Sequence, residues 1–238
     1  MFLRRLAIGI RQRDWLLILI ELVLVIAGVL IALQFDNWNT VNRNQAALNE
    51  TLGRVDAELD LNRQVIADIS AKISEHQETR SSALSALEAC DDRPEARREI
   101  DFILSDLTRD YSPSLSSTTL EQLNRRDAFL ELLSSEFRSQ LAFYTNLLHE
   151  EQTQLATNAG LRWDMHIIKH PAVSARFGDN GGMVVNAPLS DLCQNASFKR
   201  QFYITVAFVE STRLRLERFE AQMDLFQSAL DAEISQRR

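Results

Sequence analysis

The chain has 238 residues, which is enough for one ordinary domain and a membrane anchor but little more. Charged residues make up 25% and apolar residues 45%, and only 7 Gly and 4 Pro leave little loop material, so the composition favours a packed helical protein. The net charge is −7, and residues 1–14 carry a local charge of +3, so the remainder carries −10. A domain this acidic argues against nucleic acid as a partner.

The first feature along the chain is an apolar stretch at residues 15–35, WLLILIELVLVIAGVLIALQF, interrupted only by Glu21 and Gln34. As a helix it would span about 31 Å, which matches the roughly 30 Å hydrocarbon core of a bilayer. A central Glu costs about 2.5 to 3.5 kcal/mol on insertion, whereas each Leu, Ile, Val or Phe returns about 0.3 to 0.6, so insertion remains favourable. A cleaved signal peptide is the alternative, but its apolar region is usually only about 7 to 15 residues long, and no small-x-small cleavage site follows here. We therefore expect an uncleaved transmembrane helix in the lipid bilayer.

The charges that flank this stretch predict its orientation. Four arginines precede it, and Arg43 is the one basic residue in the dozen positions that follow. The positive-inside rule then makes residues 1–14 a cytoplasmic basic tail and places residues 36–238 outside the cytoplasm. Trp15 and Trp38 bracket the span, where aromatic rings favour the membrane interface.

The segment IELVLVIAGVLIALQFDNWN at residues 20–39 resembles the start of a bacterial family grouped as domain of unknown function 6090. The shared features are an early Glu, an IAL run and a closing NWN. A looser similarity continues at residues 116–144, with an aromatic pair at Phe143 and Tyr144 and with Phe129 in place of a small or polar residue. The resemblance implies a single-span protein of the bacterial inner membrane, and it implies no activity.

Beyond the span, apolar residues recur at alternating steps of four and three. This heptad seam consists of Leu48, Leu52, Val55, Leu59, Asn62, Ile66, Ile69 and Ile73, and its count continues through His76, Arg80, Ala83, Leu87 and Cys90. Such a pattern predicts a long helix with one face in a bundle.

Three further helices are predicted. Asp92 is expected to cap the second, which runs to about Asp110. A third begins after Ser117, bends near Ser134 and continues towards His170. The last occupies residues 197–236 and carries a second seam of Phe202, Thr205, Val209, Thr212, Leu216, Phe219, Met223, Phe226 and Leu230.

Residues 171–195 are predicted to be one long irregular loop, which is either a plain connector or a functional segment. The fold expected from these elements is all-α: one N-terminal transmembrane helix followed by an elongated up-down bundle of about four helices. In such a bundle Cys90 and Cys193 lie at the same, membrane-distal end.

The two cysteines of an exported domain suggest one intrachain disulfide, which would close a loop of about 100 residues and contribute roughly 4 to 5 kcal/mol. An intermolecular bond and free buried thiols are the alternatives. His166 and His170 have a spacing that zinc ligands can adopt, but no third ligand is evident, so neither a metal nor another cofactor is predicted. No catalytic constellation is recognisable either, and we expect no enzymatic activity.

Glu21 is the most informative single residue, because an ionisable group inside a span usually faces a partner helix or a cavity. Gly28 and Ala32 lie on the same helical stripe and form a small-xxx-small pair that permits close helix approach. Self-association or packing against a partner is one interpretation, and a Glu21 side chain that reaches the cytoplasmic interface is the other.

The sequence thus suggests a membrane-anchored, non-enzymatic interaction or scaffold protein that acts in the periplasm and self-associates. A periplasmic four-helix sensor that signals through a membrane or periplasmic protein partner is a second hypothesis. An oligomer that conducts ions or protons through Glu21 is a third.

Overall fold

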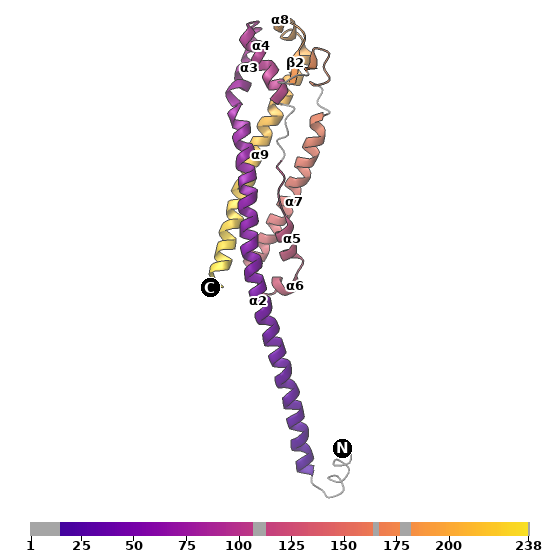
Figure 1. Cartoon of the computed structure of the whole chain (residues 1–238), viewed down its shortest axis with the longest axis vertical. Coiled ribbons are helices and arrows are strands. Elements are labelled where there is room, and N and C mark those ends of the chain that lie inside the picture. The colour runs from indigo at the N-terminus through magenta and orange to yellow at the C-terminus, as the bar shows by residue number, and fades with distance from the viewer. Residues whose placement is uncertain (1–14, 107–112, 164–166, 177–181, 238) are drawn as a thin grey trace. The chain divides into compact units, whose positions relative to one another are not determined.

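The computed structural model describes residues 15–106, 113–163, 167–176 and 182–237 (Figure 1). Of the described residues 81% are helical and 4% lie in strands. The chain forms two compact units, Met1–Thr51 and Leu52–Arg238. The predicted basic tail at residues 1–14 lies outside the described residues.

One helix, α2 (Trp15–Glu75), contains the predicted span and most of the first seam. Its apolar stretch is long enough to cross a membrane, and none of that stretch is buried within the chain. From Leu48 onwards every predicted seam position of α2 is buried, Asn62 included. The helix ends at Glu75, and after a break at His76 the next helix, α3 (Gln77–Ala89), follows directly.

The second long helix of the domain is α9 (Ala196–Ser235), whose predicted seam is buried along its length. Asn195 caps its first turn by accepting a hydrogen bond from Phe198 N at 3.0 Å. Side chains of α9 bind α2 at two places, Gln227 to Asp56 at 2.6 Å and Arg63 to Asp224 at 3.1 Å, and Tyr203 of α9 donates to Glu88 of α3. In these three pairs the residue number rises along α2 and α3 as it falls along α9, so α9 is antiparallel to α2 and α3.

The third long helix is α7 (Ser135–Trp163), which packs antiparallel to α9 through stacked aromatic rings. The ring centroids of Tyr144 and Phe226 are 4.4 Å apart, and those of Phe137 and Phe226 are 5.7 Å apart. Ser134 caps α7 by accepting from Phe137 N at 3.2 Å, at the position where the sequence predicted a bend. Tyr144 is buried, whereas its neighbour Phe143 is 55% exposed.

The predicted second helix corresponds to one helix of the structure, and the predicted third helix is divided into three. The predicted second helix is α4 (Pro94–Asp106), and the end expected near Asp110 lies outside the described residues. The predicted third helix is divided into α5 (Thr118–Asn124), α6 (Asp127–Leu130) and α7. A bundle of four long helices is therefore too simple a description of the described domain.

The predicted loop at residues 171–195 contains regular structure. Strands β1 (Val173–Arg176) and β2 (Gly182–Val185) form an antiparallel pair, with Val173 opposite Val185, and α8 (Leu189–Leu192) follows. The all-α prediction missed this hairpin. The free edge of β2 is covered by α4. Val185 N donates to Asp101 at 2.8 Å, Arg97 donates to Val185 O at 2.7 Å, and Ser105 bonds the backbone of Met183. Side chains of a helix thus satisfy the strand edge that a third strand would otherwise occupy.

Two buried polar residues of α2 hold the segment that precedes α5. Asn62 donates to Ser116 O at 2.9 Å and accepts from Ser116 N at 2.8 Å. One turn earlier, Glu58 accepts from Thr119 N at 2.7 Å, in the first turn of α5. A carboxylate is favourable there because backbone N–H groups at a helix start lack partners within the helix.

At the C-terminal end of α9, the Glu233 side chain is buried and forms a hydrogen bond with Ser134 at the start of α7. Its carboxylate accepts from Ser134 Oγ at 2.6 Å and pairs with Arg237 at 2.6 Å, and Arg237 also donates to Leu132 O. Burial of the Glu233 carboxyl favours its neutral form, but the hydrogen bonds from Ser134 and Arg237 outweigh this effect and lower its pKa.

A carboxyl whose pKa is lower in the folded state stabilises the fold above its unfolded pKa of about 4.3, and this contribution is lost as the pH falls through the folded pKa. Glu233→Gln should therefore lower the melting temperature at pH 7 and flatten its decline between about pH 5 and pH 3. The measurement is thermal unfolding followed by circular dichroism across that range. Glu131→Gln, which alters an exposed carboxylate near the same end, should shift the melting temperature little. If the melting temperatures of the parent and of Glu233→Gln declined equally between about pH 5 and pH 3, the Glu233 carboxylate would not stabilise the fold.

Candidate functional site

The residues predicted to mediate association lie on one exposed helix. Glu21, Gly28 and Ala32 are all exposed on α2, as are Trp15 at 66% and Trp38 at 63%. The Trp38 ring meets that of Phe35 edge-on at 6.1 Å. A Cβ atom added at Gly28 would meet no heavy atom of the described residues within 4 Å, apart from the backbone of its own helix. The described part of the chain therefore leaves space for a side chain at residue 28.

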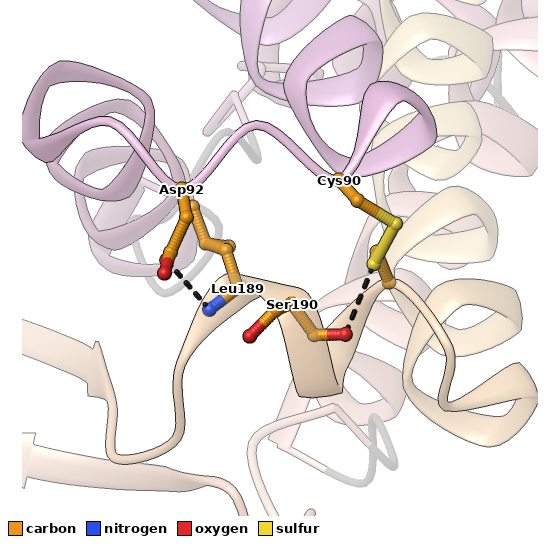
Figure 2. The surroundings of a disulfide bond; sticks show 5 residues. Cys90, Asp92, Leu189 and Ser190 are labelled. Carbon is orange, nitrogen blue, oxygen red and sulfur yellow. Dashed lines mark hydrogen bonds between the residues drawn. A yellow bond between two sulfur atoms is a disulfide. The ribbon is translucent and has the colours of Figure 1, made fainter.

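The two cysteines form a disulfide at the end of the domain where α3, α4 and α8 meet (Figure 2). Their Cα atoms are 5.3 Å apart, in the usual range for such a bond, and the bond joins residues 103 apart in sequence. Nearby, Asp92 accepts a hydrogen bond from Leu189 N at 3.1 Å, as Figure 2 also shows. Asp92 therefore bonds the first residue of α8, whereas the sequence predicted that it would cap the second helix.

Cys90 ends α3 in the left-handed conformation, with a φ of 54°. The Asp91 N–H donates to Ala86 O at 3.0 Å, which is the long-range bond of a Schellman motif. Glycine usually occupies this position because a Cβ atom costs free energy there. A cysteine at the same position indicates that the disulfide holds the chain in a conformation that its own side chain disfavours.

The break between α2 and α3 is surrounded by buried charges. The Arg80 side chain is 3% exposed and donates to Ile73 O, a carbonyl left near the end of α2. Asp106 of α4 lies 3.7 Å from Arg80 Nη1 and 3.7 Å from His76 Nε2. The His76 ring also packs edge-on against Phe102, with centroids 4.8 Å apart. Through these contacts α4 packs against the break between α2 and α3. In the sequence, the only sign of this cluster was that His76 and Arg80 occupy seam positions.

His170 has a structural role in the part of the chain that is described. It is buried, its Nδ1 accepts from Ala172 N at 3.2 Å, and its ring lies against Phe198 with centroids 5.3 Å apart. His166 lies outside the described residues. Among the described residues no group of three or more His, Cys, Asp or Glu side chains is placed to hold a metal ion.

Searches of protein-family models, curated protein sequences and solved structures found no match to this chain.

Removing the disulfide should reveal the cost of the Cys90 conformation. Cys193→Ala opens a loop of 103 residues and should lower the free energy of unfolding by about 4 to 5 kcal/mol. Of two variants without the bond, Cys90→Gly/Cys193→Ala should be more stable than Cys90→Ala/Cys193→Ala by about 1 kcal/mol, because only glycine adopts a positive φ freely. Urea unfolding of detergent-solubilised protein measures both differences. Equal stability of the two double variants would show that residue 90 leaves this conformation once the bond is absent.

Proposed function

We propose that this chain is a single-span membrane protein whose helical domain lies outside the cytoplasm and acts through protein contacts, without catalysing a reaction. The observation that carries the proposal is the continuity of α2. A single helix supplies both the exposed apolar stretch and the buried seam of the domain. A soluble protein rarely exposes so large an apolar surface, whereas a bilayer would cover it.

Two independent features support export of the domain. The arginines of residues 1–14 favour a cytoplasmic N-terminus by the positive-inside rule. The disulfide between Cys90 and Cys193 is typical of an oxidising compartment such as the bacterial periplasm. Together they favour an exported domain, and the resemblance of the anchor segment adds that the membrane is a bacterial inner membrane, which would place this domain in the periplasm.

A role in protein contacts, with self-association as the first of them, is supported by the exposed stripe of α2. Glu21, Gly28 and Ala32 share this stripe, and a second helix could approach Gly28 closely. Several buried polar groups of the domain, by contrast, bind backbone or counter-ions. Asn62, Glu58 and Glu233 are of this kind, and such bonds serve the fold.

A sensor that signals through a partner is the second candidate function. The feature that favours it is the uninterrupted course of α2 from the apolar stretch to His76, where the helix is fastened to Asp106 of α4. A ligand that rearranged the domain near this break could change the position of the end of α2 relative to α4.

The membrane proposal predicts the location of every part of the chain after about residue 40. Alkaline phosphatase fused after residue 60 or after residue 238 should be active, and a fluorescent protein that matures only in the cytoplasm should be dark at both positions. Alkaline carbonate should leave the parent chain in the membrane fraction. A variant without residues 15–35 should lose phosphatase activity in the same fusions. Fluorescent fusions without phosphatase activity would show that the domain lies in the cytoplasm, which contradicts the proposal.

Self-association is tested by a matched pair of glycine variants, since a Cβ atom added at Gly28 or at Gly53 meets no neighbouring atom within 4 Å among the described residues. Gly28→Leu should weaken association in a membrane two-hybrid assay because it forces two helices apart. Gly53→Leu should leave association unchanged. Glu21→Gln should largely preserve it, because an amide keeps a hydrogen-bond donor and an acceptor, whereas Glu21→Leu should weaken it modestly. Equal signals from Gly28→Leu and the parent would move the interface away from this stripe.

A further inference from the structure

A groove between α7 and α9 contains a cavity of about 430 Å³ that none of the features above explains. Helices of a bundle commonly form ligand sites between them, and this volume falls in the range of small-molecule pockets. Leu147 of α7 and Phe219 of α9 give the cavity an apolar part. Phe219 is 2% exposed and stacks on Tyr144, with centroids 6.0 Å apart, so this part is held by the core.

Opposite charges line the two sides of the groove. Glu150 and Glu151 belong to α7, and Arg215 and Arg218 belong to α9. The two glutamates are adjacent in α7, and the two arginines are three residues apart in α9. The groove therefore has an acidic wall and a basic wall, with two formal charges on each. A simple anion or cation would meet repulsion from one wall, whereas a molecule that carries both charges would meet attraction from both.

The central pair of these charges is incompletely bonded. Arg215 Nε lies 3.9 Å from Glu151 Oε2, which is beyond hydrogen-bond distance, and Arg215 Nη2 donates to Gln154 at 3.2 Å. Among the atoms that the structure describes, Arg215 Nη1 and Glu151 Oε2 are both hidden from solvent and have no hydrogen-bond partner. The guanidinium of Arg215 and the carboxylate of Glu151 therefore keep hydrogen-bonding capacity that they do not use on each other.

Glu151 also differs from an ordinary surface carboxylate in its ionisation. Burial raises its pKa, and repulsion by Glu150 adds to this effect, while Arg215 only partly opposes it. A cationic group bound beside Glu151 would restore the stability of the charged form.

We propose that the α7–α9 groove binds a zwitterion of amino-acid size, with its carboxylate on Arg215 and Arg218 and its ammonium on Glu150 and Glu151. The carboxylate would accept from the exposed part of the two guanidinium groups, and the ammonium would donate to the two carboxylates, so the ligand would bridge the 3.9 Å gap between Arg215 and Glu151. The side chain of the ligand would lie towards Leu147 and Phe219. This site concerns the helical domain alone and does not depend on the membrane topology or the association proposed above.

The test uses the full chain in detergent, with each proteinogenic α-amino acid at millimolar concentration as the probe. At least one should raise the melting temperature, and calorimetric titration then gives its dissociation constant. N-acetylation of that amino acid removes its ammonium, and conversion of its carboxylate to an amide removes the negative charge. Each change should weaken binding by about tenfold or more, because a charged partner is then left unpaired in the groove.

Three variants locate the site. Arg215→Gln and Glu151→Gln should each weaken binding to a similar degree, whereas Arg213→Gln should bind like the parent because Arg213 pairs with Glu210 and Glu217 on another face of α9. Circular dichroism verifies the fold of each variant, and the two ligand analogues test the charges on the unmodified protein. The proposal fails if no amino acid stabilises the chain, if either analogue binds as well as the zwitterion, or if Arg213→Gln weakens binding as much as Arg215→Gln.

Discussion

The buried seam of α2 is the constraint on which much of the domain depends, because both α9 and the segment that leads into α5 are hydrogen-bonded to this helix. Its apolar positions pack in the core, and two polar insertions, Asn62 within the seam and Glu58 beside it, bind the backbone at residues 116–119. Asn62 makes two reciprocal bonds to Ser116, so a shift of one helical turn would leave a buried amide and two backbone groups without partners. Each such group costs about 1 to 3 kcal/mol, which makes the polar insertions selective for one register. Apolar residues in their place would pack as well but would specify the position of this segment less strictly.

Periodicity explains why so much of this fold was predictable from the sequence. The two seams repeat every three and four residues over many turns, and nearly every predicted seam position is buried in the structure, from Leu48 to Ile73 and from Phe202 to Leu230. The position of the disulfide was also accessible, since two cysteines near the ends of antiparallel helices must lie at one end of a bundle. These features depend on local pattern and on connectivity, which a sequence displays directly.

The features that escaped prediction depend on contacts between distant residues. Strands β1 and β2 have four residues each, too few for a pattern to emerge, and β2 is completed by Arg97, Asp101 and Ser105 from a helix about 80 residues away. Asp92 has the sequence context of a helix cap but bonds Leu189, because the disulfide brings α8 beside it. The charges of the α7–α9 groove resemble an ordinary solvated face in the sequence. Only the structure shows that two of their atoms are hidden from solvent and incompletely bonded.

The polar interactions of the domain divide into those that close its ends and those that remain open in its middle. At one end the disulfide and Asp92 join α3, α4 and α8, and at the other Glu233 and Arg237 join α9 to the start of α7. Of these two sets of contacts, the second joins the start of α7 to α9, the two helices of the groove. Within the groove, Arg215 Nε and Glu151 Oε2 are 3.9 Å apart, so the acidic and basic walls are not joined by a hydrogen bond between these two residues. A ligand that bridges the walls would therefore gain its interactions without breaking such a bond first.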